Sequence, residues 1–209
     1  MIEFSGVKIE WLGHAGFRVE GPPTVYLDPF QVSGGPEADL ILITHDHYDH
    51  CDPDSVRRVA GPGTVVLAGP GCGPKLRGLS VREVRPGDEL EVKGVRVRAV
   101  PAYNVRPERL RFHPREKGYV GFVVELSGVK VYHAGDTDLI PEMEGLQPDV
   151  ALLPVSGTYV MDAEEAARAV ELIRPRLAVP MHYGAIVGSR RDAERFASLV
   201  RTCEVRIPG

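Results

Sequence analysis

Short apolar runs, separated by Gly, Pro or polar clusters, fill the first two thirds of the chain and recur near its end. Runs of this length and spacing are typical of β-strands. Leu40–Thr44 is apolar on both faces of the strand, as expected for a strand buried between two layers. We predict strands over Val7–Leu12, Phe17–Glu20, Thr24–Asp28, Leu40–Thr44, Thr64–Ala68, Val81–Val84, Glu89–Val92, Val95–Val100, Gly121–Leu126, Val129–His133, Val150–Pro154, Leu177–Pro180 and Glu204–Ile207.

Helical patterns are fewer and lie mainly late in the chain. A short helix is predicted over Pro53–Ala60, with Asp52 as its N-cap. Asp162 and Glu165 have the spacing of a capping box, and the apolar stripe that follows predicts a second helix, which ends before a proline. A last helix is predicted over Asp192–Val200.

The order of these elements indicates the architecture. Strands, a helix and an apolar strand ending in His occur around residues 7–60, and a similar series occurs around residues 95–182. Two such halves packed face to face would make an α/β fold, a four-layer αββα sandwich. No linker rich in Ser, Gly or charge divides the chain, so we predict a single domain over residues 1–209.

Composition narrows the possible partners. The net charge is −4, which provides no general basic field for nucleic acid. Three Cys cannot build a disulfide framework, no charged-then-apolar leader precedes Val7, and no apolar run has the length of a membrane span. We therefore expect a reduced, cytoplasmic protein that binds neither membranes nor nucleic acid. Homo-oligomers remain possible.

The segment Thr44–His50 carries the strongest chemical signal. It reads His-x-His-x-Asp-His directly after a buried strand. Imidazole and carboxylate groups suit zinc and similar divalent metals. His45 and His47, two residues apart, can point the same way, whereas Asp49 and His50 would serve a second metal nearby. The alternative is a solvated polar loop, which this concentration of ligand types does not favour.

Two later strand ends repeat this theme. Asp136 follows a strand and a Gly that allows close backbone approach, and His182 follows the apolar strand that begins at Leu177. Loops at one edge of a sheet commonly carry catalytic residues. Taken alone, Asp136 could instead cap a turn over Thr137–Met143, and His182 could be a core histidine.

These motifs resemble the metallo-β-lactamase superfamily. The resemblance rests on the His-x-His-x-Asp-His motif, on Gly135-Asp136-Thr137 and on Met181-His182-Tyr183-Gly184. Three further segments resemble its small stand-alone hydrolases, including the ascorbate-6-phosphate lactonase branch: Trp11–Phe17, Leu27–Pro29 and Leu153–Tyr159.

The resemblance implies an αββα sandwich with a two-metal site at its edge. His45 and His47 would hold the first metal, Asp49, His50 and His182 the second, and Asp136 would bridge them. A water or hydroxide between the metals would be the nucleophile. Redox relatives that use iron have Glu in place of His47, so the resemblance favours a hydrolytic site with two Zn, or alternatively Mn.

One ligand of the family pattern is missing. The family supplies a third His to the first metal just after the strand that here ends near Val100, but Pro101-Ala102-Tyr103-Asn104 contains none. We predict that His113 folds back to replace it. The alternative is a weakly held or absent first metal, with Tyr103 near the vacancy.

Three other residues are candidates for supporting roles. Asp28 and His14 also follow strands, so each could orient a metal ligand. Asp28 is equally compatible with a turn. His133 is the candidate proton donor to the leaving group, and a hydrogen-bonded core histidine is the alternative for His14 and His133.

The stretch Arg106–Lys117 has a local excess of three positive charges. If His113 reaches the site, this excess lies at its mouth and favours a small anionic substrate, bound by Arg111, Arg115 and Tyr103. We therefore predict a metal-dependent hydrolase that cleaves an ester, lactone or phosphodiester, with Asp49 orienting the nucleophile. The alternatives are a binding or sensing module that keeps the metal without turnover, and an RNA or nucleotide phosphodiesterase of the same fold.

Overall fold

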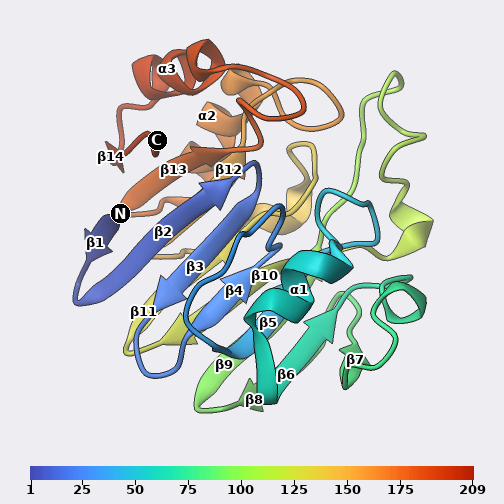
Figure 1. Cartoon of the computed structure of the whole chain (residues 1–209). Coiled ribbons are helices and arrows are strands. Elements are labelled where there is room, and N and C mark those ends of the chain that lie inside the picture. Colours follow the sequence, from blue (N-terminus) through green and yellow to red (C-terminus); the bar gives the residue numbers. More distant parts are fainter.

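Two seven-stranded sheets pack face to face in the computed structural model, which describes residues 1–209 (Figure 1). Sheet A contains β1 (Ile2–Phe4), β2 (Val7–Gly13), β3 (Gly16–Glu20), β4 (Val25–Leu27), β5 (Ala38–Ile43), β6 (Ala60–Ala68) and β7 (Val81–Glu83). Sheet B contains β8 (Glu89–Val92), β9 (Val95–Pro101), β10 (Val120–Leu126), β11 (Val129–His133), β12 (Val150–Pro154), β13 (Leu177–Met181) and β14 (Glu204–Val205).

Both sheets follow the same plan. In each, the strands lie in chain order, the first four pair antiparallel, and the fourth to the seventh pair parallel. The two predicted halves therefore correspond to the two sheets, although each sheet extends further than the repeated series in the sequence.

Helices cover the two outer faces. α1 (Pro53–Val59) lies on sheet A, where its Val56 and Val59 join a small apolar cluster with Ile41 and Ile43. α2 (Ala163–Ile173) and α3 (Arg190–Leu199) contact each other and lie over β12 and β13. The predicted four-layer αββα sandwich is confirmed. None of these helices has the length and apolar composition of a membrane span.

The main core contains 48 buried residues, lies between the sheets and extends beneath α2 and α3. Leu40 and Leu42 point into it, while Ile41 and Ile43 point to the cluster beneath α1. This division explains why the strand is apolar on both faces.

Several elements differ from the predictions. β6 begins at Ala60 rather than Thr64, β14 ends at Val205 rather than Ile207, and two further differences have identifiable reasons. β1 is only three residues long and gives too little pattern to be recognised. α3 begins at Arg190, earlier than predicted, because Ser189 is its N-cap and Asp192 is the third helical residue of a capping box.

Parallel strands place their carboxyl ends at one edge of each sheet. Asp28 follows β4, the His-x-His-x-Asp-His loop follows β5, Asp136 follows β11 and His182 follows β13. Because the two sheets are packed together, residues from both halves meet at this edge.

Candidate metal centre

Asp136 is the centre of a group of buried imidazoles. Its Oδ1 lies 3.2 Å from His50 Nε2, and its Oδ2 lies 3.2 Å from His182 Nε2 and 3.3 Å from His113 Nε2. His45 Nε2 lies 3.9 Å from the same Oδ2. Each of these five side chains is at most 4% exposed. Both sheets contribute to the group.

The outer nitrogens of these four imidazoles are all occupied. His50 Nδ1 donates to Asp28 Oδ2 at 2.7 Å, and His113 Nδ1 donates to Asn104 Oδ1 at 2.9 Å. Thr44 Oγ1 donates its proton to Asp28, so His45 Nδ1 donates to Thr44 Oγ1. These contacts, with those of His182 below, place a proton on Nδ1 and leave each Nε2 to face Asp136.

His182 follows the same rule through a residue that the sequence did not single out. Ser156 Oγ lies 3.3 Å from the carbonyl of Thr158, to which it donates, and 3.1 Å from His182 Nδ1. His182 Nδ1 therefore donates to Ser156. Ser156 lies within the Leu153–Tyr159 segment noted in the sequence, which was the available signal.

The donor atoms fit a metal centre. His50 Nε2, His113 Nε2, His182 Nε2 and Asp136 Oδ1 are buried and have no hydrogen-bond partner. Burying an unpaired polar atom costs on the order of 1–3 kcal/mol. A cation coordinated by these atoms would remove that cost, and nitrogen and carboxylate oxygen donors suit zinc and related metals.

The side chains form three overlapping groups whose donor atoms lie within 4.8 Å of one another. The members are His45, His47 and His113 in the first, His45, His50 and Asp136 in the second, and His14, Asp49, His50 and His182 in the third. The structure thus brings together all seven predicted metal ligands, together with His14.

His113 reaches this centre on a long connection between β9 and β10. Asn104 anchors the connection: its Oδ1 accepts from the His113 backbone N and ring Nδ1, and its backbone N donates to the His113 carbonyl. Asn104, within the stretch Pro101–Asn104 where the family pattern has a histidine, thus holds the His113 ring through Nδ1, the nitrogen that faces away from Asp136.

A buried ion network holds the same connection to α2. Arg109 Nη1 lies 2.6 Å from Asp138 Oδ1 and 2.8 Å from Glu165 Oε2. Asp138 also accepts from Asn104 Nδ2 and from two backbone N–H groups. The sequence analysis missed Asn104, Asp138 and the structural role of Arg109, since their partners lie on distant elements.

His14 and Asp28 each contact a different predicted metal ligand. Asp28 accepts from Thr44 N as well as from His50, so it fixes the start of the motif loop. His14 Nε2 lies 3.0 Å from Asp49 Oδ2. The carbonyl of His14 accepts from His182 N at 2.8 Å, which joins the two loops directly.

The carboxylates and imidazoles of the centre stabilise each other's charged forms. Burial lowers the pKa of His50, but the carboxylates of Asp136 and Asp28 outweigh it and raise the pKa well above its usual value. Burial would raise the pKa of Asp136, but His182 and His50 hold it well below the usual range. Burial would raise the pKa of Asp49 too, but the hydrogen bond from His14 and the charges of His50 and His14 together outweigh it and lower this pKa. Without metal, both carboxylates are therefore ionised at neutral pH.

The structure contradicts the role predicted for His133. Its side chain is completely buried, Nε2 donates to the carbonyl of Ala15, and Nδ1 accepts from Gly135 N. With both ring nitrogens bonded to backbone groups, His133 has no free site from which to protonate a leaving group.

The predicted anion-binding side chains are also placed differently. Tyr103 is buried, and its hydroxyl donates to Glu142 at 2.8 Å. Arg115 pairs with the same Glu142 and lies over the Tyr103 ring. Arg111 stacks on Phe112.

The positive excess of Arg106–Lys117 is offset as well. Arg106 and Arg109 pair with Glu165, Arg109 also pairs with Asp138, and Arg115 pairs with Glu142. Three carboxylates from other parts of the chain therefore balance the three excess charges. The charge argument for an anionic substrate fails because the partners lie outside the segment.

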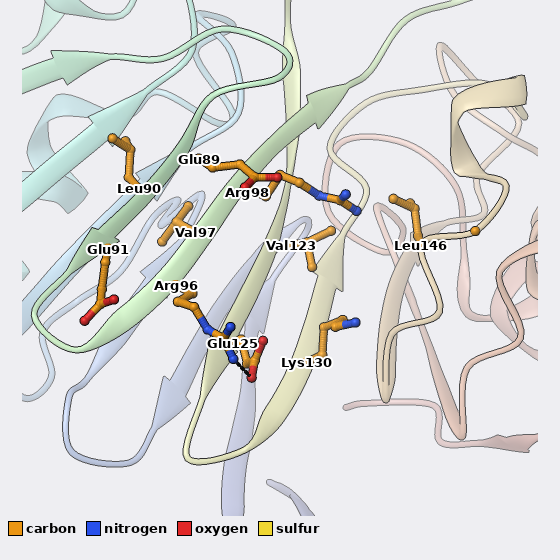
Figure 2. Close-up of a pocket in the computed structure, with 11 residues that line it drawn as sticks. Glu89, Leu90, Glu91, Arg96, Val97, Arg98, Val123, Glu125, Lys130 and Leu146 are labelled. Carbon is orange, nitrogen blue, oxygen red and sulfur yellow. Dashed lines mark hydrogen bonds and ion pairs between the residues drawn. The ribbon is translucent and has the colours of Figure 1, made fainter.

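A pocket of about 450 Å³ lies elsewhere, on the outward face of sheet B (Figure 2). It is formed by β8 to β11 and by Leu146, where no helix covers the sheet. Its lining includes the ion pair Arg96–Glu125 and no member of the metal centre.

The sequence matches known proteins over nearly its whole length. A family model described as a β-lactamase superfamily domain matches residues 8–182. The chain is 39% identical to a metal-dependent hydrolase of Thermococcus onnurineus over 93% of its own length and 92% of the relative. It is 37% identical to one of Thermoplasma acidophilum, over 94% and 92% of the two chains.

Solved structures agree with the sequence relatives. A proposed metal-dependent hydrolase from Parabacteroides distasonis is 32% identical, with a TM-score of 0.87 over 97% of this chain and 92% of that one. A metallo hydrolase from Ignicoccus hospitalis is 27% identical, with a TM-score of 0.75 over 96% and 94%. Placement in the ascorbate-6-phosphate lactonase branch stays a prediction. The chain belongs to the metallo-β-lactamase superfamily as a metal-dependent hydrolase.

Proposed function

We propose that the centre holds two divalent cations, preferably Zn, and hydrolyses an ester bond, either carboxylic (including lactones) or phosphodiester. His45, His47 and His113 would hold one cation, and Asp49, His50 and His182 the other, with Asp136 between them. The observation that carries the proposal is the convergence of buried Nε2 atoms without hydrogen-bond partners on one carboxylate.

When bound, the cations supply a water of lowered pKa as the nucleophile and polarise the substrate carbonyl or phosphoryl oxygen. The chain itself keeps the donors in place. Asp28, Asn104 and Ser156 hold the outer nitrogens of His50, His113 and His182, so the rings need little rearrangement when metal binds.

Asp49 is the one carboxylate of the centre with appreciable exposure, at 14% of its side chain. It is ionised, and His14 holds one of its oxygens. We assign Asp49 to accept a proton from the attacking water and to orient that water toward the substrate. His14 keeps Asp49 in that position.

The assignment is tested by metal content and turnover together. Chelator-treated protein is titrated with Zn, and the loaded protein is assayed against lactones, carboxylic esters and phosphodiesters. The wild-type chain is expected to bind two Zn, and His113→Ala to lose one of them together with hydrolysis. Tyr103→Phe is the matched control, since its hydroxyl contacts only Glu142 and its loss should leave metal content unchanged.

Two results would contradict the assignment. Unchanged stoichiometry and affinity in His113→Ala would remove His113 as a ligand. A wild-type protein that holds two metals and hydrolyses no member of the panel would favour a binding module.

A further inference from the structure

Exposed large apolar side chains gather at the edge that carries the metal centre. Six large hydrophobic residues are between 38% and 73% exposed, and all but Met1 lie on loops that follow strands at this edge. These five are Tyr48 after β5, Val105 and Leu110 after β9, Tyr159 after β12 and Ile186 after β13.

These side chains are continuous with the metal ligands. Tyr48 lies between His47 and Asp49 in the sequence, and its ring centroid is 6.1 Å from that of Phe30, which in turn is 5.9 Å from that of His14. The half-buried Phe112 precedes His113 in the sequence and packs edge-on against Tyr159, with the two ring centroids 4.6 Å apart. We call Tyr48, Val105, Leu110, Phe112, Tyr159 and Ile186 the apolar rim.

A hydrogen bond and a close packing contact between loops hold the apolar rim in place. Asn104 Nδ2 donates to the carbonyl of Tyr159, which joins the loops after β9 and β12. Ser156 sits against Gly188 so closely that a side chain at Gly188 would clash with it, which brings the loop of Ile186 to that of Tyr159. Exposed apolar side chains gathered beside a site commonly mark the place where a ligand binds.

Three of the five cationic side chains of Arg106–Lys117 are neutralised by ion pairs. Arg106, Arg109 and Arg115 are all paired with carboxylates. The guanidinium of Arg111 lies 4.7 Å from the centre of the Phe112 ring, so its flat face extends the rim rather than interrupting it.

We propose that the substrate carries an uncharged apolar substituent, aliphatic or aromatic, which lies against the apolar rim while the scissile ester bond lies at Asp136. This inference rests on the proposed function and defines its substrate class. A second copy of the chain or a free anion would be the other possible occupants of this edge, and the experiment below separates them.

The test uses hydroxamates, which bind metal through the same head group whatever the length or end group of their alkyl chain. Zn-loaded protein is titrated with acetohydroxamate, octanohydroxamate and an octanoyl-length analogue that ends in a carboxylate, and binding is measured by calorimetry. Since each half-covered methylene strengthens binding roughly twofold, octanohydroxamate should bind about 50-fold more tightly than acetohydroxamate.

Amino-acid substitutions show where the alkyl chain of octanohydroxamate binds. Leu110→Ser with Ile186→Ser should reduce the preference for octanohydroxamate at least about fivefold, since less apolar surface remains to cover it. Binding of acetohydroxamate should not change. Leu90→Ser, in the pocket on sheet B (Figure 2), is the matched control and should leave the preference intact.

Each other outcome has a definite meaning. Equal binding of the short and long compounds, or tighter binding of the carboxylate-ended one, overturns the apolar substrate class. A wild-type dimer that the double variant dissociates would show that the rim is covered by a second copy. Failure of acetohydroxamate to bind at all would instead overturn the metal centre itself.

Discussion

At His50, a single carboxylate determines which ring nitrogen is available to a metal. Asp28 Oδ2 accepts the proton of Nδ1 at 2.7 Å, and the same side chain accepts from Thr44 N and Thr44 Oγ1. Asp28 is completely buried. Its position after β4 made this contact foreseeable, because β4 and β5 are parallel neighbours that end at one edge.

Replacing that carboxylate should weaken metal binding without removing a ligand. Asp28→Asn is expected to lower Zn affinity about 10- to 100-fold, since the amide orients and polarises the His50 ring less strongly. Competition with a chromophoric chelator measures the change. Asp39→Asn is the control, because Asp39 accepts from Thr24 N away from the centre. Equal Zn affinity in Asp28→Asn and the wild type would contradict the role.

Residue position along a strand explains why His133 differs from His182. His133 is the last residue of β11 and pairs with Phe122 and Leu152, so its ring lies within the layers of the sandwich. His182 comes one residue after β13 ends, where the backbone has a φ of 61° and turns the ring toward Asp136. A difference of one position relative to the end of the strand therefore places His133 in the core and His182 in the metal centre.

At the scale of elements, the connection between β9 and β10 is the part of the centre with least regular structure. It contains no α-helix or strand, yet it carries His113. Arg109, which is 7% exposed, compensates by joining it to Asp138 and Glu165. The precision of the metal centre therefore depends on an ion network outside it.

Removing Arg109 should loosen this connection. Arg109→Met removes the cation that two buried carboxylates share and is expected to lower the free energy of unfolding by about 3 kcal/mol. Urea unfolding of the metal-free protein measures this. Arg115→Met is the control, since its exposed pair with Glu142 is worth about 1 kcal/mol or less. Similar losses in the two variants would contradict a structural role for the network.

The same network predicts how stability depends on pH. Burial raises the pKa of Glu165, but hydrogen bonds from Arg109, Asp162 N and Arg106 outweigh it and lower the pKa below its usual value. The unfolded chain, with a Glu pKa of about 4.3, therefore takes up this proton first as the pH falls. The stabilisation is complete above that value and is lost as the pH falls toward the lowered, folded pKa.

Glu165→Gln should therefore flatten the acid side of the stability profile. Urea midpoints of metal-free wild type and variant, measured between about pH 6 and 3, should converge as the pH falls. Glu171 lies exposed on the same helix and forms no ion pair, so Glu171→Gln is the matched control. Parallel profiles for Glu165→Gln and the wild type would rule out the contribution.

At the scale of the whole molecule, the metal centre joins the two sheets. The proposed ligands come from loops after β5, β9, β11 and β13, so a cation there would cross-link both halves. The unfolded chain has no such arrangement, and metal binding therefore adds to the stability of the folded state.

Metal removal should lower thermal stability measurably. At a free Zn concentration about 1,000 times Kd, binding adds about 4 kcal/mol, which corresponds to a rise of roughly 10 °C in Tm for a chain of this size. Scanning calorimetry of chelated and reloaded protein measures it. Mg, which prefers oxygen ligands, should produce little change. Equal Tm values with and without Zn would contradict a metal held by the folded centre.

Short-range sequence patterns predicted most of the helices and strands and the His-x-His-x-Asp-His motif after β5. Strand periodicity, the capping box at Asp162 and the spacing of His45 and His47 depend on residues only a few positions apart, which act the same way in any tertiary context. Such patterns could not predict that distant carboxylates offset the positive charges of Arg106–Lys117, or that His133 lies in the core. Arg109 meets a carboxylate 56 residues away, and His133 meets a carbonyl 118 residues away. Only the packing of the two sheets brings such partners together, because contacts at that separation are set by the folded core and leave no periodic trace in the sequence.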